Sequence, residues 1–113
     1  MARPSHEYSE SNAALGAAFD VLGKRWTARI LYALGDGPLS FSGVGQNVDG
    51  ISDSVLSTRL SELAQLALVD RSVDGGPPIA VTYRLTPAGS HLVPALAFVG
   101  EWAAANLPAR PLS

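Results

Sequence analysis

Short hydroxyl side chains gather between positions 52 and 61, and this segment is the part of the chain best suited to specific polar contacts. Leucines at helical spacing predict a helix there with one buried face. The opposite face has Arg59 at its edge and carries four hydroxyl side chains: Ser54, Ser57, Thr58 and Ser61. Such side chains let a helix approach base edges closely, and they donate or accept hydrogen bonds. Arg59 can bind a guanine edge or a phosphate. The alternative is that this face is merely solvated.

Cations elsewhere in the chain are candidates for contacts with the phosphate backbone of a nucleic acid. Lys24 and Arg25 are predicted at the start of a second helix, where free N–H groups also attract anions. Arg71 and Arg84 are predicted on facing strands, near the base of a hairpin. Arg29 is expected instead to pair with Asp20 or another acid inside the fold. For the other cations, plain solvation is the competing interpretation.

Two serines are expected to cap helices, and both are assigned to the same set of DNA-contacting residues. Ser40 can cap a short helix over residues 41–48, and Ser52 can cap the helix that has the hydroxyl face. Asp53 follows Ser52, where a negative charge suits the positive end of the helix dipole. These caps predict where both helices begin.

The surrounding pattern predicts the elements that hold these residues in place. It indicates four helices, then two strands joined by a turn rich in glycine and proline, then a last helix opened by Thr86 and Pro87. The expected helices span residues 12–22, 24–34, 41–48, 53–66 and 87–106, and the expected strands span 68–73 and 79–85. This order is typical of the winged helix-turn-helix, a mostly helical α+β fold in which one helix enters the major groove.

The composition fits one compact domain with an apolar face left over. The chain has 113 residues, of which 47% are hydrophobic and only 16% are charged. We expect residues 1–11 and 108–113 to be flexible and residues 12–107 to form the domain. So little charge predicts an apolar surface that a second copy of the chain covers. The net charge of −2 argues mildly against nucleic acid, so affinity for DNA must come from the spatial arrangement of the charges.

Several other classes of function are excluded or disfavoured. The chain has no cysteine, which excludes a disulfide scaffold, a thiolate metal site and thiol-based redox sensing. His6 and His91 suggest neither a metal site nor a catalytic base, and no nucleophile elbow or phosphate-binding glycine loop is present. No catalytic residue, metal or cofactor is therefore expected, and no enzyme activity. The polar N-terminus and the lack of a long apolar run predict a cytoplasmic protein with no membrane partner.

Five segments in order resemble the HxlR family of bacterial regulators. Residues 21–31 (VLGKRWTARIL) resemble the family's opening motif, and residues 51–63 (ISDSVLSTRLSEL) resemble its recognition helix. The other three segments are residues 37–41 (GPLSF), 68–71 (LVDR) and 81–89 (VTYRLTPAG). Trp102 stands where the family has a tryptophan in its last helix. The resemblance implies a winged-helix transcriptional regulator with a MarR-like fold that binds DNA.

The resemblance also implies a homodimer. In the family the two terminal helices build the two-fold interface, and the large apolar side chains assigned to it here are Leu15, Phe19, Phe98, Val99 and Trp102. The alternative is that these side chains simply cover the core of one chain. A small-molecule effector is a further expectation, in a cavity near this interface lined by Trp26, Phe19 and Trp102.

Three departures from the family pattern qualify these expectations. Many members carry a cysteine just before the first helix, and this chain has none, so a cysteine-based signal is excluded. Ser40 stands where an arginine usually precedes the phenylalanine, which removes one phosphate contact. Ala67 stands where the family has a glycine in the turn before Leu68.

The sequence therefore predicts a regulator that binds double-stranded DNA as a homodimer, with recognition helices in two successive major grooves about 34 Å apart. An inverted-repeat operator and repression of transcription are the expected mode of action. The competing interpretation is a winged-helix module that binds another protein and no DNA. The neutral charge balance favours this alternative, as does the hairpin tip at residues 74–78, which has one acid and no base.

Overall fold

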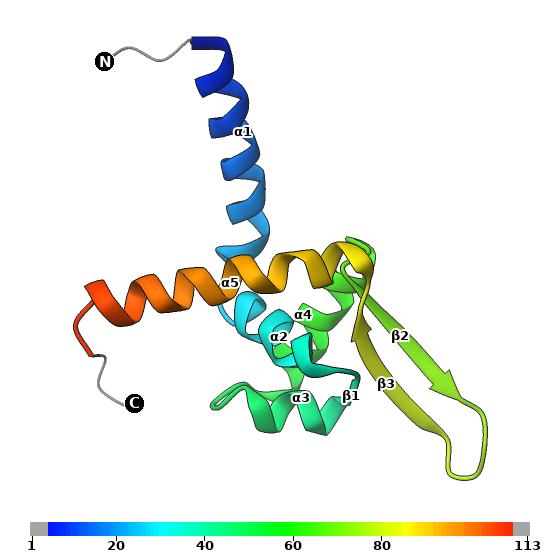
Figure 1. Cartoon of the computed structure of the whole chain (residues 1–113). Coiled ribbons are helices and arrows are strands. Elements are labelled where there is room, and N and C mark those ends of the chain that lie inside the picture. Colours follow the sequence, from blue (N-terminus) through cyan, green and yellow to red (C-terminus); the bar gives the residue numbers. More distant parts are fainter. Residues whose placement is uncertain (1–4, 110–113) are drawn as a thin grey trace.

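The architecture is a winged helix-turn-helix with two long terminal helices, which confirms the predicted fold class (Figure 1). The structure is a computed structural model and describes residues 5–109, with side chains from residue 9 onward. Its elements, in chain order, are α1 (Ser5–Leu22), α2 (Thr27–Ala33), the 3-10 turn η1 (Leu34–Asp36), β1 (Leu39–Ser40), α3 (Phe41–Asn47), α4 (Asp53–Gln65), β2 (Val69–Asp74), β3 (Ala80–Leu85) and α5 (Pro87–Asn106).

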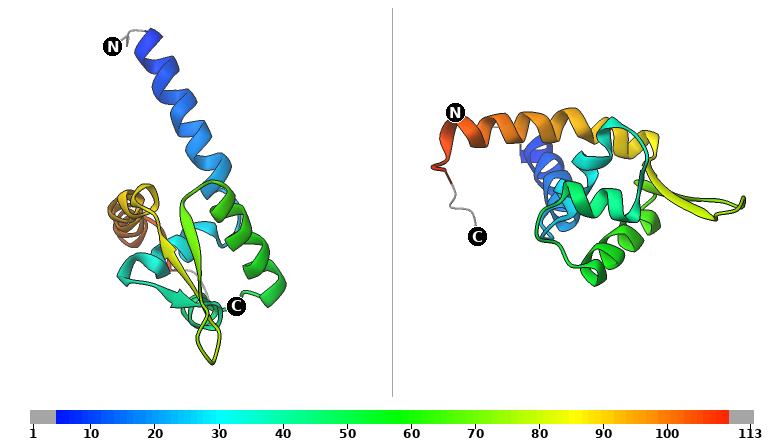
Figure 2. Two further views of the ribbon diagram at one scale, coloured as in Figure 1. Left: turned by 90° about the vertical axis from the view of Figure 1, so that its right-hand side faces the viewer. Right: turned by 90° about the horizontal axis from the view of Figure 1, so that it is seen from below.

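The body of the domain consists of α2, α3, α4 and the base of the sheet, and three parts extend from it. α1 stands away from the body in Figure 1 and in the left view of Figure 2. α5 runs across the body and past it, and the β2–β3 hairpin extends on another side. The principal extents of 63 × 34 × 23 Å reflect this elongated shape.

The hydrophobic core lies where α2, α3 and α4 meet. Its buried side chains are Ile30, Leu31, Leu34, Val44, Val48, Leu56, Leu60, Leu63 and Val69. Those on the helices follow the spacing that the sequence shows, because one face of each helix points inward. Leu66, which directly follows the end of α4 at Gln65, is 51% exposed and lies outside this core.

The predicted helix caps are confirmed. The hydroxyl oxygens of Ser40, Ser52 and Thr86 each accept a hydrogen bond from the backbone N–H three residues later. Pro87 occupies the first turn of α5, where its missing N–H has no partner to lose. α5 then continues through Pro94 to its end. These caps fix where α3, α4 and α5 begin.

The sheet has one strand more than the predicted hairpin. β2 and β3 pair antiparallel, from Val69 opposite Leu85 to Asp74 opposite Ala80. β1 pairs with the other edge of β3, which gives the strand order β1-β3-β2. β1 has only two residues, too few for an alternating pattern to reveal it. It ties the start of α3 to the hairpin.

Two helices begin at positions that the sequence did not predict. α1 begins at Ser5 rather than at residue 11 or 12, so part of the segment expected to be flexible is helical. α2 begins at Thr27 rather than at residue 24, because Trp26 has a left-handed backbone (φ 82°) that a right-handed helix cannot contain. The ends at residues 1–4 and 110–113, for which flexibility was also predicted, lie outside the described residues.

Two backbone positions explain residue types in the family motifs. Ala67 has a left-handed backbone (φ 58°) in the turn where the family has a glycine, and glycine adopts this conformation without strain. A side chain at Gly89 would collide with the carbonyl oxygen of Leu68, because α5 starts directly against the beginning of β2. Thr86 Oγ1 also donates a hydrogen bond to the carbonyl oxygen of Ala67 (2.7 Å). The base of the hairpin is thus held against α5.

Candidate nucleic-acid interface

The hydroxyl face of α4 is exposed. Ser54, Ser57, Thr58 and Ser61 lie on its solvent side, whereas its leucines point into the core. Within the described part of the chain, the hydroxyls of Ser57 and Ser61 have no hydrogen-bond partner, so both can donate and accept. Thr58 Oγ1 donates to the carbonyl oxygen of Ser54 (3.0 Å) and is left mainly as an acceptor. The middle of α4 therefore offers the polar groups that base readout needs.

The two capping serines have less to offer. Ser40 and Ser52 are exposed, but each hydroxyl oxygen already accepts a backbone N–H at its helix start. Ser40 Oγ also lies 3.3 Å from Ser42 Oγ, and Ser52 Oγ lies 3.5 Å from Ser54 Oγ. Contact with a phosphate would use their hydroxyl protons, and it stays a prediction.

Arg59 is less available than the sequence suggests. Its side chain is only 22% exposed. Nε donates to the carbonyl oxygen of Arg25 (3.1 Å), and NH1 lies 3.0 Å from Glu62 Oε1. A contact with a base or a phosphate would have to use the remaining N–H groups of the guanidinium. Base readout by Arg59 stays a prediction, now with this geometric constraint.

Lys24 binds the same carboxylate. It lies in the loop between α1 and α2, and its Nζ is 2.9 Å from Glu62 Oε2. The hydrogen bond from Lys24 is the main cause that lowers the pKa of Glu62 below 4.5; desolvation opposes this, and Arg59 adds to it. The two oxygens of one ionised carboxylate therefore hold two of the cations that were predicted to meet DNA.

Arg25, Trp26 and Arg29 form a stacked group where α2 begins. The guanidinium carbons of Arg25 and Arg29 lie 4.6 and 4.4 Å from the centroid of the Trp26 ring, within the range of a cation–π interaction. The ion pair expected between Arg29 and an acid is not found among the described residues. The same ring reaches the α3–α4 turn, where a Cβ at Gly50 would lie 3.3 Å from it. Trp26 thus links α2 to the turn before α4.

Exposed apolar side chains flank the tip of the β2–β3 hairpin. Val73 and Ile79 are 52% and 71% exposed. Asp74, the acid at the tip, accepts a hydrogen bond from the backbone N–H of Gly76 through Oδ1 (3.3 Å). Its carboxylate is therefore partly turned back onto its own loop. The tip offers little positive charge to a minor groove, as the sequence predicts.

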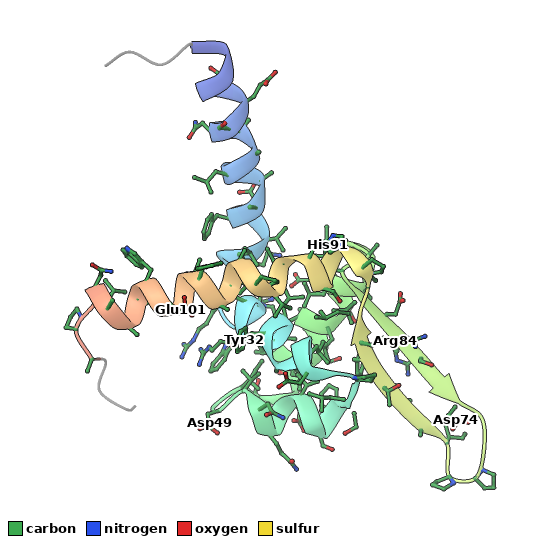
Figure 3. All side chains as sticks on the ribbon, in the orientation of Figure 1. Tyr32, Asp49, Asp74, Arg84, His91 and Glu101 are labelled. Carbon is green, nitrogen blue, oxygen red and sulfur yellow. The ribbon has the colours of Figure 1, made fainter. Side chains whose placement is uncertain are left out.

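Cations lie nearer the base of the hairpin. Arg71 and Arg84 are both exposed, and Figure 3 shows Arg84 between the body and Asp74. In the strand ladder, Arg71 lies opposite Tyr83 and Arg84 lies opposite Asp70. Neither arginine forms an ion pair among the described residues, so both are available to bind phosphate.

The side chains predicted for a dimer interface are all exposed. Each of them is more than half exposed: Leu15, Phe19, Phe98, Val99 and Trp102. Every residue of α1 from 9 to 20 is exposed, and only Val21 and Leu22 in its last turn pack against the core. The side chains of α1 extend into solvent along the upper part of the molecule in Figure 3. These residues do not cover the core of their own chain, which was the alternative.

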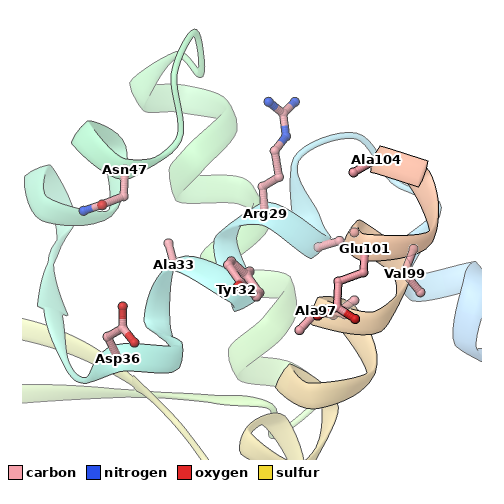
Figure 4. A pocket seen from close by; sticks show the side chains of 12 residues that line it. Arg29, Tyr32, Ala33, Asp36, Asn47, Ala97, Val99, Glu101 and Ala104 are labelled. Atoms are coloured by element: carbon pink, nitrogen blue, oxygen red, sulfur yellow. The ribbon is translucent and has the colours of Figure 1, made fainter. Parts of the chain in front are cut away.

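An open cleft of about 820 Å³ lies between α2 and α5 (Figure 4). Arg29, Tyr32 and Asp36 line it from one side, and Glu101 lines it from α5. Asn47, at the end of α3, also borders it. The remaining lining is largely alanine and aliphatic, so the cleft is apolar with polar groups spread around it.

The small-molecule cavity expected near the dimer interface, with Phe19, Trp26 and Trp102 as its lining, stays a prediction. Phe19, Trp26 and Trp102 do not line the α2–α5 cleft. Within residues 9–109, no group of three or more histidine, cysteine or acidic side chains is placed to hold a metal ion. No helix of the described chain has both the length and the apolar character needed to cross a membrane.

An exposed polar helix that follows α3 in a helix-turn-helix, beside a hairpin wing, defines the class: a winged-helix DNA-binding domain. The model of the HxlR-like helix-turn-helix family matches residues 21–111, and the chain belongs to this family. It is a transcriptional regulator with a helix-turn-helix DNA-binding domain. This sets aside the interpretation as a module that binds protein and no DNA.

Curated relatives support the same assignment. The chain is 38% identical over 87 residues to the HTH-type transcriptional regulator YodB of Bacillus subtilis, which covers 77% of this chain and 78% of YodB. It is also 38% identical over 86 residues to YvaP of the same organism, an uncharacterized HTH-type transcriptional regulator, covering 76% and 80% of the two chains. Relatives that regulate transcription imply a non-enzymatic role.

Solved structures of regulators share the fold. The reduced form of YodB from B. subtilis superposes with a TM-score of 0.73 at 34% identity, over 95% of this chain and 96% of YodB. The oxidized form of the redox regulator HypR gives a TM-score of 0.78 at 28% identity, over 85% and 99% of the two chains. Quinone-bound YodB gives 0.70 at 34% identity, over 82% and 98%.

Glu62 is the residue that the sequence analysis did not single out. It lies three positions after Arg59 in α4, the spacing at which opposite charges meet on a helix. That signal was present in the sequence. Lys24 is 38 positions away from Glu62, and only the fold brings the two together.

Proposed function

We propose that the protein is a homodimeric repressor that acts in the cytoplasm and binds an inverted-repeat operator through α4. The observation that carries the proposal is the exposed hydroxyl face of α4, where Ser57 and Ser61 have no partner among the described residues. In a helix-turn-helix the second helix enters the major groove, and short polar side chains reach the base edges. Each copy of α4 would read one half-site.

A second copy of the chain is proposed to cover α1 and α5. Phe98 is 72% exposed and Trp102 is 57% exposed, and apolar surface of this size is unfavourable in water. A two-fold arrangement covers the same patch on both chains at once. The two copies of α4 would then face one side of a duplex, about 34 Å apart.

Phosphate contacts are proposed for the cations that the fold leaves available. Arg25, Arg71 and Arg84 are exposed, whereas Lys24 and Arg59 are bound to Glu62. Three contacts from each chain would give a slope of about −5 in a plot of log K against log salt concentration. A much steeper slope would mean that Lys24 and Arg59 leave Glu62 when DNA binds.

Selection of bound fragments from a random pool of double-stranded DNA tests sequence specificity, and an inverted repeat is the expected product. Ser57→Glu would place a carboxylate against the duplex and is expected to weaken binding about 100-fold, with an unchanged Tm. Ser90→Glu makes the same change on an exposed residue of α5 and serves as the matched control. No enriched sequence, or equal binding by both variants, would refute the proposal. In vitro transcription from the operator then tests repression.

A small-molecule effector is proposed for the α2–α5 cleft. The cleft is apolar and has Arg29 and Tyr32 at its border, which suits a small aromatic molecule. A relative, YodB, has been solved in a quinone-bound form. A thermal-shift screen with small aromatic compounds is expected to find some that raise the Tm. The shift should disappear in Ala97→Trp, which fills the cleft; a shift that persists would place the compound elsewhere.

A further inference from the structure

α1 joins the rest of the protein through a short junction, defined here as residues 23–26. Apart from Val21 and Leu22 in its last turn, the described side chains of α1 do not pack against the core. The helix ends at Leu22, and the N–H of the next residue, Gly23, donates to the carbonyl oxygen of Phe19 (2.8 Å). Because α1 has so little contact elsewhere, its direction relative to the body depends on how the junction is held.

Two side chains of α4 hold this junction. Glu62 binds the ammonium group of Lys24 through one oxygen (2.9 Å) and the guanidinium of Arg59 through the other (3.0 Å). Arg59 in turn donates to the main-chain carbonyl oxygen of Arg25 (3.1 Å). Because this last bond is to the main chain, it fixes the path of the junction and not only a side chain. Two successive junction residues are thus tied to one turn of α4.

We infer that Glu62 is a positioning residue that sets the direction of α1 relative to α4. The inference rests on the proposed function, in which α1 builds the dimer and α4 reads DNA. In such a dimer, the angle between α1 and α4 sets the distance and the rotation between the two copies of α4. It therefore sets the spacing of half-sites that the dimer accepts. Glu62 itself touches no DNA and acts through Lys24 and Arg59.

A role in folding alone does not account for this network. Ion pairs between partly exposed side chains add little to the free energy of unfolding, and the Lys24 side chain is 50% exposed. The network nevertheless joins residues 38 positions apart, at the place where the protruding helix leaves the body. Its main effect is therefore on orientation.

Four substitutions separate the effect of Glu62 from that of net charge. Glu62→Gln removes both ion pairs and one negative charge. Asp74→Asn removes one negative charge from an exposed residue at the end of β2, outside the junction. Lys24→Gln removes one of the two pairs, whereas Lys24→Arg keeps a cation for Glu62.

The first test measures binding to the selected operator and to versions in which the half-sites are moved by one or two base pairs. The wild type, Asp74→Asn and Lys24→Arg are expected to prefer the original spacing equally. In Glu62→Gln the ratio of Kd values between shifted and original operators should fall about fivefold or more, the lower end of usual coupling between sites. Lys24→Gln should show a smaller fall. An unchanged ratio in folded Glu62→Gln would overturn the inference.

The second test needs no DNA and so separates this inference from the proposed function. The chain has no cysteine, so Ser57→Cys can carry a single spin label on α4. Pulsed dipolar spectroscopy then gives the distribution of label-to-label distances in the dimer. We expect the distribution to broaden with Glu62→Gln and not with Asp74→Asn. Broadening in a protein that binds no DNA would refute the proposed function alone. Equal widths, or the absence of a dimer, would refute the inference.

Discussion

The body of the protein and its two terminal helices differ in how completely one chain buries its apolar side chains and pairs its charged ones. In the body, apolar side chains such as Leu56 are fully buried, and Glu62 binds two cations of its own chain. On the terminal helices, Phe19 and Phe98 are 53% and 72% exposed. The body is therefore suited to fold as a single chain, and the terminal helices are suited to association. Substitutions confined to one region can test this difference.

The largest effect on folding is expected in the body. Leu56→Ala removes a fully buried side chain and leaves a cavity in the core, so the free energy of unfolding should fall by about 2–5 kcal/mol. Urea denaturation followed by circular dichroism measures this change. Leu66→Ala is the control, since that leucine is 51% exposed, and it should lose less than about 1 kcal/mol. Equal losses would contradict the assignment of the core.

A substitution on α5 is expected to affect association instead. Phe98→Ala should raise the dissociation constant of the dimer about 10- to 100-fold, from the loss of roughly 1.5–3 kcal/mol of apolar burial. Sedimentation velocity over a range of concentrations measures it. Ile79→Ala is the matched control, because Ile79 on the hairpin tip is 71% exposed, against 72% for Phe98. If Ile79→Ala dissociates the dimer and Phe98→Ala does not, the interface lies at the hairpin.

A smaller effect is expected where the body meets α5. Thr86→Ala removes the cap of α5 and the hydrogen bond to the carbonyl oxygen of Ala67 (2.7 Å), so it should destabilise the protein by about 1 kcal/mol. Thermal denaturation measures the change in Tm. Thr86→Ser keeps the hydroxyl and should recover most of the loss. If serine and alanine behave alike, the cap does not stabilise this boundary.

The smallest effect concerns pH. Lys24 and Arg59 lower the pKa of Glu62 below 4.5 in the folded protein. At pH values between the folded-state and the unfolded-state pKa of Glu62, the unfolded chain therefore binds more protons than the folded one. The resulting stability is present above the unfolded-chain pKa and is lost as pH falls through the folded value. The Tm difference between wild type and Glu62→Gln should therefore shrink between about pH 6 and about pH 3. A Tm difference that stays constant over this pH range would contradict the lowered pKa of Glu62.

Much of the fold follows from short-range signals in the sequence. The caps at Ser40, Ser52 and Thr86 depend on backbone groups three residues away, and the core leucines follow one helical period. β1 was missed because a strand of two residues has no pattern of its own and exists only through its pairing with β3. The start of α2 was misplaced because the left-handed backbone of Trp26 has no signal in the residue type.

The candidate site, too, could be predicted from the sequence only in part. The exposed face of α4 could be predicted, since it is the complement of the leucine stripe. The restraint on Arg59 could not, because it depends on a carbonyl group of the α1–α2 loop that the chain brings close only on folding. Lys24 was assigned to DNA for the same reason: its charge was visible in the sequence, but its partner Glu62 was not.

One of the two tryptophans lies in the body and the other on a terminal helix. Trp26 lies beside Arg25 and Arg29 where α2 begins, while Trp102 is 57% exposed on α5. Replacing either one with phenylalanine leaves a single indole emitter in the other region. The wavelength and quenching of intrinsic fluorescence can then follow the junction and the pairing of chains as separate optical signals, with no added dye.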